Sequence, residues 1–140
     1  MTFLKKHLYK TNIIITLLSL IMFSCSHENT IFGIWKPVSI VLPENIQQDP
    51  IKAKTAVTTF EQSKDMFYNF HADSTFTLET EVDVPGLKNL VGSFSVIGKK
   101  IVINFNTAKL ESEIDQLTDS TMNVRSDDNT IIVFKKIRDN

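Results

Sequence analysis

Residues 76–84, which read FTLETEVDV, decide the fold of this chain. Apolar residues at positions 76, 78, 82 and 84 alternate with polar ones, and only position 80 departs from the pattern. Alternation with a period of two places the apolar side chains on one face of a strand and the polar ones on the other. It is typical of an antiparallel sheet with one face on the core and one in water. The stretch therefore predicts a β-protein.

Similar segments recur along the chain, separated by turn signals such as Ala72-Asp73-Ser74 and Pro85-Gly86. Pro37 lacks a backbone N–H, so it predicts an irregularity in the first strand. Short strands with regular turns favour an antiparallel sandwich or barrel, and closure into a barrel removes unpaired edges. The eight predicted strands cover residues 31–42, 66–71, 76–84, 90–97, 101–107, 110–117, 121–126 and 130–138.

The sequence predicts one helix, at residues 51–65. Apolar residues at positions 53, 56, 57 and 60 follow the i, i+3, i+4, i+7 spacing of a single helical face. Asp49 is suited to cap the helix and Pro50 to begin it. The helix would lie between the first two strands and cover an open end or a flank, after a loop at residues 43–49.

The N-terminus has the order of a secretion signal. Lys5, Lys6 and Lys10 precede an apolar core of eleven residues, 13–23, and Ser24 follows it. A membrane-spanning helix needs about 20 apolar residues, whereas a signal-peptide core has about 7–15. An uncleaved membrane anchor is the less favoured alternative.

The segment Met22-Phe23-Ser24-Cys25 resembles the lipobox of bacterial lipoproteins in the relaxed form of the Bacteroidota. The resemblance implies a signal peptide at 1–24, two or three acyl chains such as palmitate on Cys25, and a tether at 25–30. Ser26, in place of an Asp, favours anchoring in the outer membrane, facing either the periplasm or the surface. A plain signal peptide with a free cysteine is the alternative.

Cleavage before Cys25 would leave 116 residues with 12 basic and 16 acidic side chains, a net charge of −4. This size predicts one domain, and the acidic balance argues against nucleic-acid binding. The single cysteine excludes an internal disulfide. The five residues 26–30 can span only about 15–18 Å, so the domain would begin close to the bilayer.

Gly33-Ile34-Trp35 matches the Gly-x-Trp motif of lipocalin-like families. The turns at 72–76 and 117–122 and the closing strand at 132–136 also resemble small lipocalin-like lipoproteins of the Bacteroidota. The resemblance covers residues 31–138 and implies an antiparallel lipocalin-like barrel, which the predicted elements make eight-stranded; the predicted helix between strands 1 and 2 is not standard in these families. The resemblance also implies that Trp35 packs across the closed end under a basic residue: Arg138, Lys135 or Lys136.

The barrel interior carries the leading functional hypothesis. Aromatic residues could either line an apolar pocket or fill the interior, since an eight-stranded barrel is only just wide enough for side chains. We expect a monomer that binds a small apolar ligand or lipid, with no cofactor. The alternative is an envelope interaction module, such as an inhibitor, immunity protein or structural partner, with a filled core. The candidate pocket residues are Tyr68, Phe70, Phe76, Phe94 and Phe105.

Nothing in the sequence favours an enzyme. His71 has only Asp73 nearby as a partner, across a predicted turn. The acidic row at 79, 81 and 83 could hold a hard cation, but it is more typical of a solvated strand face. Asp127-Asp128-Asn129 is first of all a turn signal. His27 lies in the tether. The sequence predicts neither a metal site nor a catalytic residue.

Overall fold

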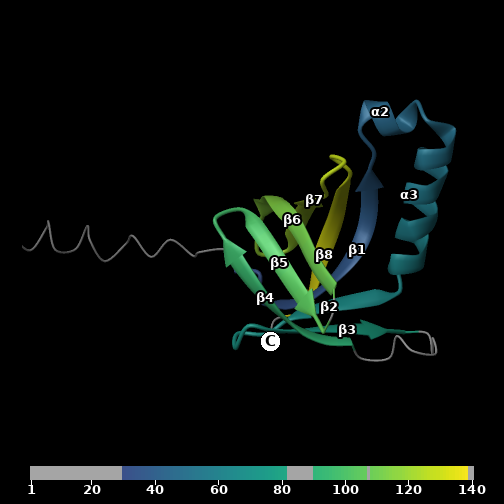
Figure 1. Ribbon diagram of the computed structural model, residues 1–140. Coiled ribbons are helices and arrows are strands. Elements are labelled where there is room, and N and C mark those ends of the chain that lie inside the picture. Colours follow the sequence, from purple (N-terminus) through teal and green to yellow (C-terminus); the bar gives the residue numbers. More distant parts are fainter. Residues whose placement is uncertain (1–29, 82–89, 107, 139–140) are drawn as a thin grey trace, which may run out of the picture.

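The computed structural model describes residues 30–81, 90–106 and 108–138. They form a closed barrel in which the strands follow chain order and each pairs antiparallel with its neighbours, β8 closing on β1 (Figure 1). The predicted fold class is therefore confirmed. The strands are β1 (Gly33–Val41), β2 (Met66–Phe70), β3 (Thr75–Thr80), β4 (Leu90–Ile97), β5 (Lys100–Phe105), β6 (Ala108–Leu117), β7 (Thr121–Arg125) and β8 (Ile131–Arg138).

Strand positions agree with the alternation in the sequence, to within a few residues at each end. The last part of the predicted strand 76–84 lies outside the described residues. Three register shifts interrupt the pairing of the described strands, the first of them between Ile34 and Trp35 in β1–β8. The β1–β8 register shifts between Pro37 and Ser39, where the proline predicted it. In β6 a shift between Ile114 and Gln116 lets Ile114 and Leu117, three residues apart, both pack on the core.

Two helices connect β1 to β2: α2 (Glu44–Gln47) and α3 (Pro50–Ser63). The predicted cap of α3 is confirmed, because the Asp49 carboxylate accepts hydrogen bonds from the backbone N–H groups of Ile51 and Lys52, both at 3.1 Å. These bonds, the one from Lys52 above all, lower the pKa of Asp49.

The prediction of a loop at 43–49 was wrong, because α2 occupies its centre. Its single turn begins at Pro43 and buries Ile46. A helix this short carries too little sequence pattern to be recognised, and here the burial of one side chain holds it.

The helix α3 stands beside the barrel and contacts β1 (Figure 1). Only Phe60 of its predicted apolar face is fully buried, while Val57 remains exposed. No helix among the described residues is long and apolar enough to cross a membrane.

Short polar side chains shape the turns between strands. Asp73 accepts hydrogen bonds from the backbone N–H and the hydroxyl of Thr75, at 3.0 and 2.6 Å, and Ser74 takes a positive φ of 67°. Asp128 accepts from the backbone N–H of Thr130 in the β7–β8 turn, at 2.9 Å. These are the bonds that make Asp a turn residue, so the turns predicted at both places are confirmed.

Candidate ligand cavity

Trp35 lies in the hydrophobic core near the end of the barrel where β1 begins. Its side chain is completely buried, and its ring N–H donates a 2.7 Å hydrogen bond to the carbonyl oxygen of Ile31, just before β1 begins. A buried indole needs such a partner for its single donor. The bond ties the start of the domain to the floor of the barrel.

The cation over the Trp35 ring is Lys136, whose Nζ lies 5.0 Å from the ring centroid. The sequence alone does not decide among Arg138, Lys135 and Lys136 for this role. Arg138 is instead the register partner of Ile34 at the end of β8. A cation over an indole face is attracted by the ring quadrupole, so Lys136 covers Trp35 from outside.

Gly33 stands where the β1 and β8 backbones approach each other. Its φ is +125°, and a Cβ placed there would lie 2.8 Å from the carbonyl oxygen of Arg138. Only glycine adopts this conformation without strain and leaves room for that oxygen. A steric constraint therefore explains why the Gly-x-Trp motif begins with glycine in this chain.

Phenylalanine rings fill one part of the barrel interior. The Phe70 ring centroid lies 4.9 Å from that of Phe76 and 5.0 Å from that of Phe94. Phe105 stacks edge-on against Phe76 at 5.5 Å. Three of the five candidate pocket residues, Phe76, Phe94 and Phe105, thus belong to the packing and do not line the cavity.

The other part of the interior contains a cavity of about 180 Å³. Five strands line it, and each contributes two residues that are two positions apart, because alternate side chains of a strand point to the same face. Tyr68 and Phe70 are the candidates that line it. The lining residues are Tyr68 and Phe70 from β2, Ile101 and Ile103 from β5, Leu110 and Ser112 from β6, Met122 and Val124 from β7, and Ile132 and Phe134 from β8.

None of these ten residues carries a charge, and Tyr68 and Ser112 alone bring hydroxyl groups. Burial raises the pKa of Tyr68, so its phenol stays protonated and can donate a hydrogen bond. An apolar wall with a few convergent hydroxyls is typical of sites for small apolar molecules with a polar tip.

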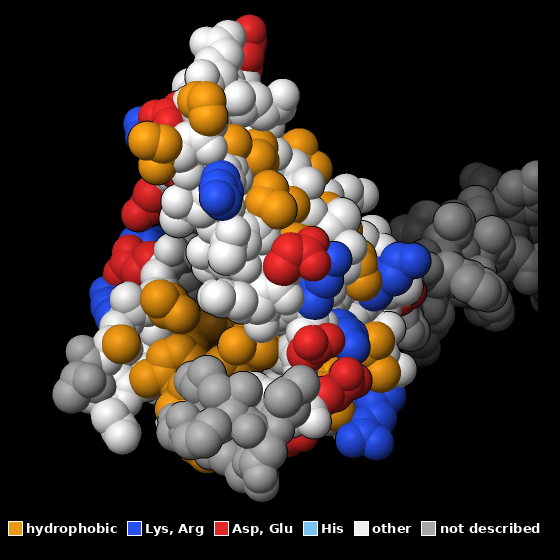
Figure 2. Space-filling model, turned by 90° about the vertical axis from the view of Figure 1, so that its right-hand side faces the viewer, with side chains coloured by type: hydrophobic (Ala, Val, Ile, Leu, Met, Phe, Trp, Pro, Cys, Tyr) orange, Lys and Arg blue, Asp and Glu red, His pale blue; other side chains and the backbone are white. Residues whose placement is uncertain are grey.

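Leu110 marks where the cavity meets solvent, since it lines the cavity and yet is 54% exposed. It lies at the start of β6, at the end of the barrel opposite Trp35. Figure 2 looks onto the molecule from the α3 side and shows a hollow edged by hydrophobic side chains. The cavity therefore has its mouth on the side of the helices, and the fully buried Trp35 lies towards the opposite end of the barrel, called the closed end below.

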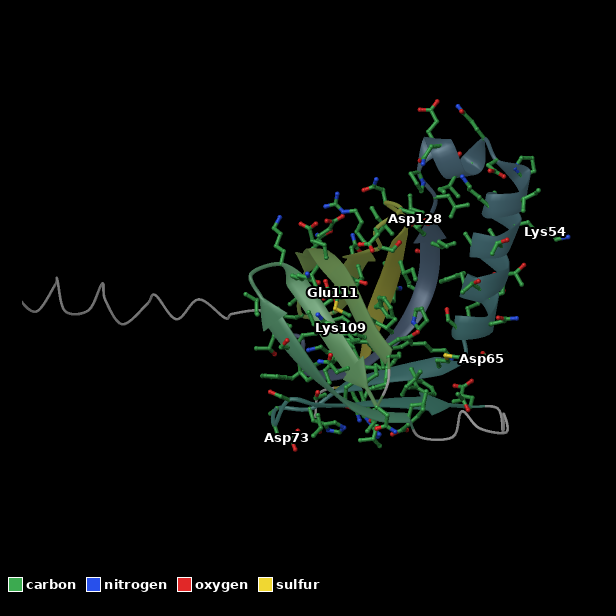
Figure 3. The ribbon with its side chains drawn as sticks, viewed as in Figure 1. Lys54, Asp65, Asp73, Lys109, Glu111 and Asp128 are labelled. Atoms are coloured by element: carbon green, nitrogen blue, oxygen red, sulfur yellow. The ribbon has the colours of Figure 1, made fainter. Side chains whose placement is uncertain are left out.

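A larger groove of about 520 Å³ extends from the β4–β5 turn across β6 to the β7–β8 turn, and several of its charged side chains form ion pairs. Lys100 and Lys109 both bind Glu111, which Figure 3 shows beside Lys109. Their hydrogen bonds lower the pKa of Glu111 to about 2. Arg125 pairs with Asp115 across the β6–β7 ladder. These pairs leave Lys99 and Asp127 as charged groove residues that form no ion pair with a described residue.

The residues weighed for catalysis do not assemble. His71 Nε2 lies 3.3 Å from the Thr77 hydroxyl, while the Asp73 carboxylate is engaged by Thr75. Asp83 and His27 lie outside the described residues, as does Cys25. Across residues 30–81, 90–106 and 108–138, no group of three or more His, Cys, Asp or Glu side chains is placed to hold a metal ion.

Comparison with solved structures places this geometry among known folds. A lipocalin-like protein from Bacteroides uniformis superposes with a TM-score of 0.54 at 16% identity, over 76% of this chain and 97% of that one. The fold is lipocalin-like. An uncharacterized protein from Bacteroides eggerthii gives a TM-score of 0.53 at 14% identity, over 75% of this chain and 98% of that one. No protein-family model and no curated protein matches the sequence.

Most of the cavity wall was not singled out as a pocket from the sequence. Ile101, Ile103, Leu110, Ser112 and Met122 fall within predicted strands, and no further sequence pattern marks them as pocket residues. The available signal was the pairing of residues two apart within a strand. That signal identifies inward-facing residues, but it does not reveal where the interior stays empty.

Proposed function

We propose that the protein is a non-enzymatic, lipid-anchored binding protein of the bacterial outer membrane that holds a small apolar molecule in its barrel. The cavity of about 180 Å³ carries the proposal, because five strands surround it with uncharged side chains. The lipocalin-like fold supports it only as an analogy between folds. The anchor rests on the sequence around Cys25.

The size of the cavity narrows the class of ligand. Pockets for drug-sized molecules measure about 300–1,000 Å³, whereas a dry apolar cavity of about 150 Å³ is enough to hold benzene. We therefore propose a compact apolar molecule, or one end of an acyl chain whose remainder leaves through the mouth beside Leu110. The Tyr68 and Ser112 hydroxyls would meet a carbonyl or hydroxyl group on it.

The cavity weighs against the alternative of an interaction module with a filled core. Such a module would pack its interior with side chains, as the phenylalanine cluster does in only one part of this barrel. Native mass spectrometry of the protein purified from its own host separates the two. A co-purifying small-molecule mass supports the carrier, and a stable protein complex with an empty barrel supports the module.

Benzene titration followed by methyl NMR tests the cavity directly. We expect benzene to shift the methyl signals of Ile103, Val124 and Ile132, and Val124→Phe to abolish these shifts by filling the cavity. Val91→Phe is the matched control, because Val91 is an exposed β4 valine that does not line the cavity. Unshifted signals in the unmodified protein would contradict the proposal.

A further inference from the structure

The antiparallel order assigns every connection to one of two ends of the barrel. The start of β1, the β2–β3, β4–β5 and β6–β7 turns and the end of β8 share one end. The α2–α3 connection lies at the other, where the cavity opens, and the β7–β8 turn lines one outer groove together with Ile97 and Lys99. Because Trp35 is bonded to Ile31, the chain reaches the barrel from the tether at the closed end.

The β4–β5 hairpin projects from this closed end and has an amphipathic tip. Ile97 is 76% exposed, and Val96 before it is also exposed. Gly98 turns with a φ of +61°, and a Cβ built on it would have no heavy atom within 4 Å, so Gly98 faces open space. Lys99 and Lys100 follow, both exposed.

The hairpin is joined to the point where the tether begins. Phe32, next to Ile31, packs edge-on against Phe94 of β4, with ring centroids 6.4 Å apart. Phe94 lies three residues before Ile97 on the same strand. Hence the hairpin tip and the start of the tether lie close together at the same end of the barrel.

We propose that the β4–β5 hairpin rests on the lipid bilayer. Ile97 would lie at the boundary between headgroups and acyl chains, and Lys99 would face the lipid phosphates. The inference rests on the lipid anchor at Cys25 from the proposed function. A tether of five residues reaches at most about 15–18 Å, so the closed end cannot leave the vicinity of the membrane. An exposed apolar residue beside lysines is the composition that interfacial segments use on anionic membranes.

Charge distinguishes the hairpin from the β2–β3 and β6–β7 turns, while the end of β8 adds exposed Lys135 and Arg138 at the same end of the barrel. Asp73 in the β2–β3 turn lies at the same end, on the lower side in Figure 3, and Asp119 lies in the β6–β7 turn. These carboxylates are repelled by anionic phosphates. Lys99 forms no ion pair with any residue that the structure describes, whereas Lys100 is engaged by Glu111. Lys99 is thus the cation of the tip that is available to lipid.

This contact fixes the orientation of the cavity. With the closed end on the bilayer, the mouth beside Leu110 points away from the membrane. The ligand would therefore exchange with the aqueous compartment and not with the bilayer that holds the anchor.

Site-specific fluorescence quenching on the lipidated full-length protein tests the orientation. A bimane label is placed on Ile97→Cys in one variant and on Ile51→Cys in another. Ile51 is a matched control, because it is 79% exposed and lies on α3 at the mouth end. The protein is bound to vesicles of phosphatidylethanolamine and phosphatidylglycerol.

We expect the label at 97 to be shielded from aqueous iodide and quenched by a lipid-borne nitroxide, and the label at 51 to behave in the opposite way. Adding Lys99→Glu should weaken the shielding at 97. Equal quenching at both positions on vesicle-bound protein would overturn the proposal. So would shielding at 97 before vesicles are added, which would assign the tip to a second copy of the chain. A protein that never stays with the vesicles instead refutes the anchor, which is a separate failure.

Discussion

At the scale of single residues, Trp35 has the largest predicted effect on stability. It is completely buried, bonded to Ile31 and covered by Lys136. Truncating a buried Trp to Ala typically costs about 3–5 kcal/mol, through lost transfer energy and the cavity left behind. We expect Trp35→Ala to lower the free energy of unfolding by that amount in urea denaturation. A loss below about 1 kcal/mol would mean that the ring does not support the barrel floor.

Of the three cations near the end of β8, Lys136 is the one that lies over the Trp35 ring. We expect Lys136→Met to destabilise the protein by about 0.5–2 kcal/mol, the range for a cation over an aromatic face. Lys135→Met and Arg138→Met are the controls, since Lys136 is the cation placed over the Trp35 ring. Urea denaturation of the three variants measures the difference. An equal loss of stability in all three variants would attribute the effect to the change in net charge and not to the contact with the Trp35 ring.

Among the elements, the β5–β6 strand pair makes a pH-dependent contribution to the free energy of unfolding. The Lys100 and Lys109 hydrogen bonds lower the pKa of Glu111 from 4.5 to about 2, so the folded state binds this proton less tightly than the unfolded state. The stabilisation is therefore complete above about pH 4.5 and is lost as the pH falls towards 2. Because these side chains are exposed, the effect is small and decreases with salt.

Glu111→Gln tests this linkage. We expect the variant to be less stable than the unmodified protein at neutral pH, and the gap in the free energy of unfolding to close through the acidic window. Glu79→Gln serves as the control, because Glu79 is exposed on β3 and forms no ion pair with a described residue. A gap that is independent of pH would contradict the assigned role of the two lysines.

Local sequence signals were sufficient to predict the start of α3 and two of the turns. Asp49 and Pro50 defined the start of α3, and Asp73 and Asp128 defined turns, because each acts through hydrogen bonds within a few residues. Such interactions are encoded locally, so the sequence predicts them. The turn of α2 depends on burying Ile46, which no local pattern reveals.

At the scale of the whole molecule, attachment and folding should be separable. Cys25 precedes every strand of the barrel, so Cys25→Ala removes the site of acylation without removing a residue of β1–β8. We expect this variant to leave the membrane fraction while keeping the far-UV circular dichroism and melting temperature of the barrel. Ser26→Ala should stay membrane-bound. Cys25→Ala protein that still pelleted with membranes would refute the lipoprotein hypothesis.

The strands, their turns and the capped helix α3 could be predicted from the sequence, whereas the secretion signal ending at Cys25 stays a prediction. The confirmed elements follow from backbone periodicity and from interactions between close neighbours in the chain. Tertiary structure alone decided that Lys136 covers Trp35, that α2 forms, and that Phe76, Phe94 and Phe105 pack while Tyr68 and Phe70 line a cavity. Whether the interior is filled depends on the summed side-chain volumes of eight strands and on bulges that re-aim them. Those quantities exist only once the barrel has closed.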